Sequence, residues 1–185
     1  MKKIAFILAF IVTLVFTSHG QVLTVGNGNA TNEFFPLSYR MWLYPQRGQV
    51  LYPASMLTAM QGKYISGLSL YYHVDQCNGC TSTNYTHLDG TQTVRIGHTS
   101  ASNLSGGFTS DTLETVWVGT MEDVTIGGLT TDGEVRILFD RAFLYQGGNL
   151  LIDLQTYDDA QTNGWYFFFW YGQNTSVANS YHSGS

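Results

Sequence analysis

The chain has 185 residues, enough for one well-buried domain, and 44% of them are hydrophobic while only 11% are charged. Its 13 acidic and 8 basic side chains give a formal net charge of −5, which argues against binding to nucleic acid or to an anionic membrane. Aromatic residues make up 15% of the chain and 20 residues are glycine, a composition typical of an extracellular β protein that excludes a helical or disordered chain.

Residues 1–20 have the three parts of a secretory signal peptide. Two lysines give a positive start, residues 4–16 are apolar, and small residues precede Gln21. A membrane anchor is the alternative, but the apolar run is too short to span a bilayer comfortably. We therefore expect 1–20 to be removed on export, and 21–185 to form one β-sandwich domain that is secreted or held at the cell surface and does not span the membrane.

Short runs of alternating apolar and polar residues follow, and each run predicts a strand. In the first half of the chain these runs are 22–25, 34–37, 39–44, 49–52 and 64–73. Within the last run we expect one face to carry Tyr64, Ser66, Leu68, Leu70 and Tyr72. Helix is expected only between Pro53 and Gly62, for one or two turns.

In the second half the predicted strands are 93–97, 113–120, 124–126, 135–139, 150–154 and 165–171, and 100–107 is expected to be a loop or single turn. Val94 and Ile96 are expected to point inward. So are Leu150, Ile152 and Leu154, which alternate with Leu151, Asp153 and Gln155.

Three features mark the C-terminal part of the chain. Gly147 and Gly148 can adopt the positive φ of a tight turn. Residues 165–171 are aromatic at every position, which favours a place in the middle of a layered structure. The polar tail after Gly172 is expected to fray.

Roughly ten short strands separated by turn signals predict an all-β fold, a jelly-roll-like antiparallel β-sandwich in a single domain. A small outer-membrane barrel is the rival hypothesis. Its strands would need apolar outward faces about ten residues long, and most runs in this chain are shorter.

Six segments occur in an order that resembles a known family. They are TVGNG at 24–28, QVLYPA at 49–54, GKYISGL at 62–68, VRIGHT at 94–99, YQGGNLLID at 145–153 and FWYG at 169–172. Together they resemble a β-sandwich module of cell-surface and secreted, adhesin-like proteins of Bacteroidota. The resemblance implies a jelly-roll-like fold and a surface location, and it assigns no catalytic residue. The chain departs from the family pattern in the loop that holds Cys77 and Cys80.

Cys77 and Cys80 are separated by Asn-Gly, which suits a tight loop. In an exported protein the favoured interpretation is a disulfide across that loop, worth about 2 kcal/mol through chain entropy. A zinc site with His73 and His87 is an alternative, although the spacing fits no standard finger. Redox catalysis is disfavoured, because no helix is expected after the second cysteine.

Several aromatic residues could stack against a sugar ring, although most large aromatics pack in a core. The candidate platform residues are Trp42, Tyr44, Trp117, Tyr157, Trp165 and Trp170. The predicted ligand-binding set is Trp165, Tyr157, Asn163 and Trp42, because Trp165 adjoins the polar loop 158–164. Asp158 and Asp159 in that loop are weak calcium candidates, and no other cofactor is expected.

No nucleophile elbow or zincin motif is present, and nothing in the sequence pairs the acids Asp89, Glu114, Asp123 and Asp140. We therefore expect no enzymatic activity. The leading hypothesis is an exported, non-catalytic surface module that binds a glycan or a protein. A structural subunit of a surface fibre is the alternative, favoured if 22–25 is an unpaired edge strand. A small secreted hydrolase is a third possibility.

Overall fold

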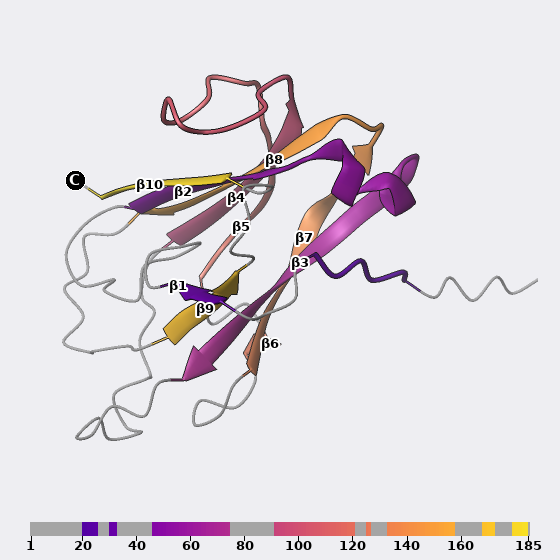
Figure 1. The fold of residues 1–185 in the computed structure, drawn as a ribbon. Coiled ribbons are helices and arrows are strands. Elements are labelled where there is room, and N and C mark those ends of the chain that lie inside the picture. The colour runs from indigo at the N-terminus through magenta and orange to yellow at the C-terminus, as the bar shows by residue number, and fades with distance from the viewer. Residues whose placement is uncertain are drawn as a thin grey trace, which may run out of the picture.

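The computed structural model describes residues 20–25, 30–32, 46–74, 91–120, 125–126, 133–157, 168–172 and 179–184. These residues form two five-stranded antiparallel sheets that lie one against the other as separate layers (Figure 1). The predicted all-β sandwich is confirmed. In the described part of the chain, no helix has the length and apolar character needed to cross a membrane.

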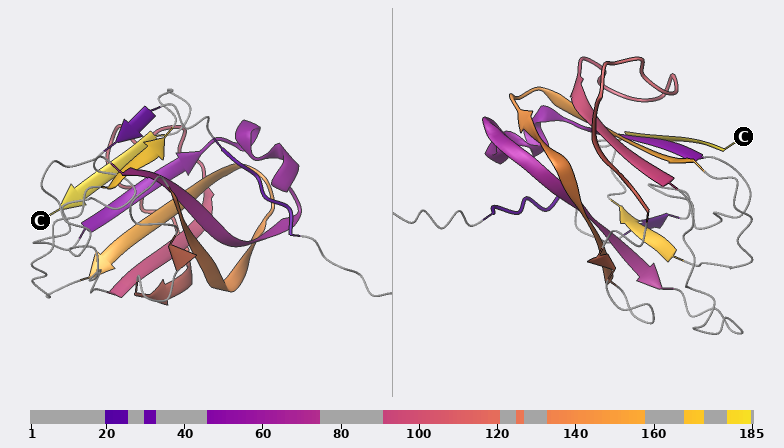
Figure 2. Two further views of the ribbon diagram at one scale, coloured as in Figure 1. Left: turned by 90° about the horizontal axis from the view of Figure 1, so that it is seen from below. Right: turned by 180° about the vertical axis from the view of Figure 1, so that it is seen from behind.

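Each sheet mixes strands from distant parts of the chain, as the two further views make plain (Figure 2). Sheet A has the order β1 (Ala30–Asn32), β9 (Phe168–Gly172), β3 (Lys63–Val74), β7 (Gly133–Tyr145) and β6 (Thr125–Ile126). Sheet B has the order β10 (Asn179–Gly184), β2 (Gln46–Tyr52), β8 (Asn149–Tyr157), β4 (Thr91–Thr99) and β5 (Glu114–Gly119). The C-terminal part of the aromatic segment forms β9, which lies between β1 and β3 in sheet A.

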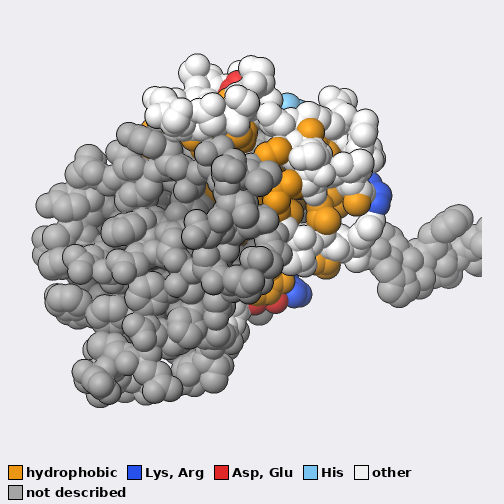
Figure 3. Space-filling view, in the orientation of Figure 1, with side chains coloured by type: hydrophobic (Ala, Val, Ile, Leu, Met, Phe, Trp, Pro, Cys, Tyr) orange, Lys and Arg blue, Asp and Glu red, His pale blue; other side chains and the backbone are white. Residues whose placement is uncertain are grey.

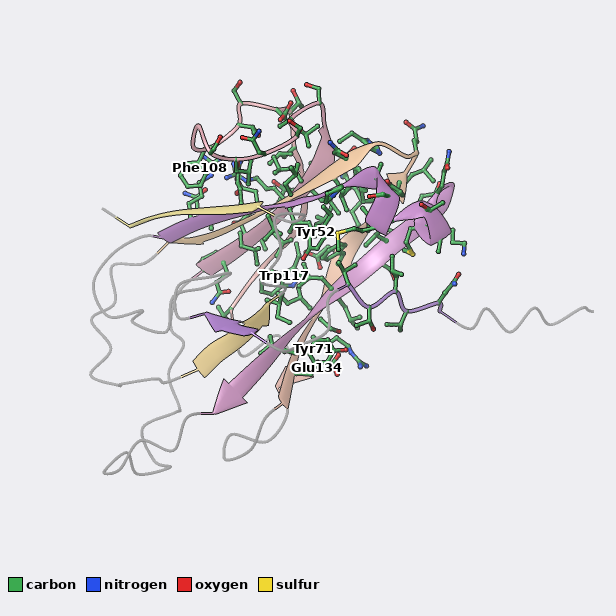
Figure 4. The ribbon with its side chains drawn as sticks, viewed as in Figure 1. Tyr52, Tyr71, Phe108, Trp117 and Glu134 are labelled. Atoms are coloured by element: carbon green, nitrogen blue, oxygen red, sulfur yellow. The ribbon has the colours of Figure 1, made fainter. Side chains whose placement is uncertain are left out.

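Side chains that point from each sheet toward the other form the main core. Its buried members include Val94, Ile96, Leu150 and Leu154, which were predicted to point inward, together with Val135 and Ile137. Burying a side chain of this kind contributes about 1.5–3 kcal/mol. Trp117 of β5 also belongs to this core and is only 5% exposed, so it cannot serve as a sugar platform. Figure 4 shows Trp117 and Tyr52 between the two sheets.

The turns behave as the glycine positions predicted. Gly147 and Gly148 have φ of 104° and 87° in the turn between β7 and β8, and the Tyr145 hydroxyl donates to the Gly148 carbonyl at 2.5 Å. Before β3, two short 3₁₀ turns, Ala54–Met56 and Thr58–Met60, take the place of the predicted helix and end before Gly62. Residues 100–107 contain one turn, closed by Gly107 N–H donating to Leu104 O at 3.0 Å.

The segment 22–25 and the C-terminal tail both differ from expectation. Residues 22–25 form no strand, because Leu23 and Val25 pack against the core as an irregular segment while Val22 is exposed. The polar tail does not fray throughout, since β10 pairs with β2 along its whole length. The predicted strands at 34–37 and 39–44 lie outside the described residues.

One predicted face is wrong. Leu68 and Leu70 pack against the core, but Tyr64 is 65% exposed on the opposite side of sheet A. The pairing of β3 with β7 shifts register between Ile65 and Gly67, and such a bulge turns the residues on its two sides to different faces. A Cβ on Gly67 would lie 2.6 Å from the Ile137 carbonyl oxygen, so this close approach requires glycine.

Candidate functional site

Most of the predicted site residues lie outside the described residues. This is true of Trp42, Asn163 and Trp165, of both cysteines, and of the calcium candidates Asp158 and Asp159. For Tyr157 the structure gives only the backbone, which ends β8 opposite Thr91. Of the four acids considered for hydrolysis, Glu114 lies on β5 of sheet B and Asp140 on β7 of sheet A, both exposed.

The structure instead draws attention to a carboxylate that the sequence reasoning missed. Asp153 occupies the centre of β8, and its side chain is 0% exposed although it points away from the main core. A buried ionised carboxylate is strongly unfavourable unless charged and hydrogen-bonding partners surround it. The outer face of sheet B must therefore supply those partners.

Strand register brings the partners to Asp153. Gln49 of β2 and Arg95 of β4 lie directly opposite Asp153 on its two sides, and Arg47 lies opposite Gln155. Residues opposite one another in antiparallel strands share a face of the sheet. We call Arg47, Gln49, Arg95, Asp153 and Gln155 the Asp153 cluster.

Both carboxylate oxygens of Asp153 are saturated with donors. Oδ2 accepts hydrogen bonds from Arg47 Nε and Gln49 Nε2, each at 2.8 Å, and lies 2.7 Å from Arg47 Nη2. Oδ1 accepts from Arg95 Nη2 at 2.7 Å and from Arg95 Nε at 3.2 Å. Charge-assisted bonds of this kind are about twice as strong as neutral ones, so the two guanidinium groups are held in fixed positions.

The cluster carries more positive than negative charge. Two guanidinium groups face one carboxylate, and the remaining members, Gln49 and Gln155, are neutral. The arginine side chains stay 32% exposed at Arg47 and 26% exposed at Arg95, while the carboxylate between them is fully covered. Within the described residues, the hydrogen bonds to the cluster use Nε and Nη2 of each arginine.

The connection between β4 and β5, residues 100–113, covers part of this face. It passes directly over Gly97, where a Cβ would lie 2.8 Å from the Thr112 carbonyl oxygen. Leu104 of the connection packs with Leu51 and Leu151 into a second, smaller apolar cluster. Figure 4 shows Phe108 of this connection on the outer side of sheet B.

Two contacts tie the connection to the Asp153 cluster. Thr109 N–H donates to Gln49 Oε1 at 2.9 Å, and the Arg47 guanidinium lies 4.5 Å from the centre of the Phe108 ring. A cation in this position over an aromatic face is stabilised by about 0.5–1 kcal/mol. Farther along, Thr99 Oγ1 donates to Asp111 Oδ2 at 2.6 Å. The connection is thus fixed to the sheet at several points, and the cluster lies beside it.

Comparison with known proteins gives no relative: no family model, curated protein or solved structure matches the chain. In the part of the chain that the structure describes, no group of three or more His, Cys, Asp or Glu side chains could hold a metal ion. Among the described residues, Asp153 is the buried charged side chain, and the two arginines that pair with it are partly exposed.

Proposed function

We propose that this chain is an exported, non-catalytic β-sandwich module that binds a glycan or a protein at the cell surface. The observation that carries the proposal is the Asp153 cluster, in which two partly exposed arginines are locked around one buried carboxylate. The signal-peptide pattern of residues 1–20 and the family resemblance support export and a surface location. A disulfide between Cys77 and Cys80 would suit that environment.

A purely structural role explains the cluster less well than a binding role. Replacing a buried ion pair by apolar side chains of similar size is often neutral or stabilising, so stability alone does not call for these charges. One arginine would neutralise Asp153, whereas the chain, which is acidic as a whole, places two there. Among the described residues, Asp153 is the one carboxylate that these two arginines share, and we propose that a partner uses the second positive charge.

The scaffold suits binding in a further respect. Arg47, Asp153 and Arg95 lie on three neighbouring strands, β2, β8 and β4, which fix their backbones through continuous antiparallel pairing. Donors that are already held in place lose little conformational entropy when a ligand arrives, and this increases affinity. The fibre-subunit alternative gains no such support, because 22–25 forms no edge strand.

Binding of the secreted chain, residues 21–185, to a glycan array and to fixed bacterial cells tests the proposal. We expect binding that is reduced in Arg95→Gln and Arg47→Gln. Arg136→Gln is the matched control, because Arg136 also pairs with a carboxylate, at 3.0 Å, but on the outer face of sheet A. Thermal unfolding of each variant verifies that it is folded. Absence of binding to every glycan and cell surface, or equal binding by all three variants, would contradict the proposal.

A further inference from the structure

We infer that the ligand of this module is an acidic glycan, and that Arg47 and Arg95 together bind one singly charged acidic group of it, a sugar carboxylate or a sulfate ester. This inference rests on the proposed function and deepens it by naming the class of ligand. It follows from the charge balance of the Asp153 cluster, from the partial exposure of its two arginines, and from the polar groups on the same face.

Among the described residues, the Asp153 cluster has two positive charges and one negative charge. Asp153 is the carboxylate that bridges the two guanidinium groups, and its oxygens already receive all the bonds described above. A second anionic group on the open side of the arginines would complete an alternating arrangement of two cations and two anions. Guanidinium presents paired N–H donors that match two oxygens of a carboxylate or sulfate group.

The position of the cluster disfavours an acidic peptide. Peptides commonly bind by adding a strand to a free sheet edge or by placing apolar side chains in a groove. Here β8 and β4 both have neighbours on each side, so no free edge adjoins Asp153 or Arg95. The nearby apolar side chains Leu51 and Leu151 of sheet B are buried against Leu104 of the connection, so they offer no apolar groove to a peptide.

Neutral polar side chains occur in the Asp153 cluster itself and in the connection that lies beside it. Gln155 accepts a hydrogen bond from Arg95 Nη2 at 2.9 Å and stays partly exposed, and the connection carries exposed Ser102, Asn103 and Ser105. Amides and hydroxyls are suitable partners for sugar hydroxyls. The net charge of −5 works against general attraction to polyanions, so recognition must come from the local arrangement of the arginines.

Isothermal titration calorimetry with defined hexasaccharides tests the inference on the secreted chain. The probes are hexasaccharides containing galacturonate, glucuronate or mannuronate, their methyl esters, a sulfated galactose hexasaccharide and a neutral galactose hexasaccharide. We expect at least one acidic probe to bind, with affinity about 10- to 100-fold above its uncharged counterpart, and Arg47→Gln and Arg95→Gln to lose a similar factor. Arg136→Gln should bind like the unchanged chain.

The arms of the experiment separate the possible outcomes. Preference for uronate over sulfated probes identifies the acidic group as a carboxylate, and the reverse preference identifies it as a sulfate ester. Equal affinity for acidic and neutral probes, or no acidic probe bound, overturns the inference. If the chain still binds the array or the cells in that case, the proposed binding function holds but the ligand is not an acidic glycan. If neither experiment shows binding, the proposed function is wrong as well.

Discussion

On both sheets, alternate residues point outward, away from the main core. Large apolar residues that point outward are exposed on sheet A, whereas outward residues at the centre of sheet B are buried. On sheet A the outward residues Tyr64 and Leu138 are 65% and 70% exposed. On sheet B the outward residues Leu151 and Asp153 are both 0% exposed. Apolar side chains thus lie in water on one face, while a carboxylate is buried on the other.

The difference arises from what covers each face. Residues 100–113 lie over sheet B, where Leu104 seals the apolar end and Thr109 binds Gln49. Among the described residues, no comparable connection covers Leu138. In the space-filling view, apolar side chains are visible on the side of the molecule where β3, β7 and the 3₁₀ turns lie, with few charges among them (Figure 3). Alternation determines which face a side chain joins, and a distant segment determines whether that face is buried.

The largest expected effect comes from removing the buried charge. Asp153→Asn keeps the shape of the side chain but leaves two guanidinium groups without a counter-charge. We expect a loss of about 3 kcal/mol in the free energy of unfolding, the low end for a broken buried pair because both arginines are partly exposed. Urea unfolding measures the loss.

Asp140→Asn is the matched control for this change, because Asp140 is an exposed carboxylate on β7 of sheet A. Surface substitutions of this kind change the free energy of unfolding by no more than about 0.5 kcal/mol. If the two variants unfold at the same urea concentration, the negative charge of Asp153 does not stabilise the fold.

A smaller effect is expected from two leucines that both point outward. Leu151→Ala on sheet B should cost about 2–3 kcal/mol, because it removes buried methyl groups and leaves a cavity beside Leu51 and Leu104. Leu138→Ala on sheet A should change stability by no more than about 0.5 kcal/mol. Thermal and urea unfolding of both variants measure the difference, and equal losses would mean that the connection does not cover sheet B in solution.

The sequence predicted those parts of the fold that depend on near neighbours. Val94, Ile96, Leu150 and Leu154 were placed inward correctly, because a period of two is visible within a few residues. The turn at Gly147 was predicted for a similarly local reason, since glycine tolerates its positive φ.

The candidate site could not be predicted in the same way. Arg47 is 106 residues from Asp153 along the chain and Arg95 is 58, so the register of three strands brings them together. One signal was present in the sequence: a charged residue among the apolar residues of β8. The alternation rule assigned it to solvent, because nothing local indicates that residues 100–113 fold back over the strand.

The smallest expected effect concerns the ion pair between Arg136 and Glu134 on the outer face of sheet A. The pKa of Glu134 is lowered chiefly by a hydrogen bond from the Ser69 side chain, and secondarily by Arg136, despite some opposing desolvation. A lowered pKa stabilises the fold above the ordinary pKa of glutamate, and this contribution is lost as pH falls through the lowered value.

Ser69→Ala and Arg136→Gln should therefore each raise the pKa of Glu134 toward its ordinary value. An NMR titration of the Glu134 side-chain carboxyl carbon measures both changes. Because the pair is largely exposed, salt should weaken the Arg136 contribution more than that of Ser69. A larger pKa shift in Arg136→Gln than in Ser69→Ala would mean that the arginine charge controls the pKa of Glu134, as charge controls the Asp153 cluster. The two faces would then differ only in how far their charged groups are buried.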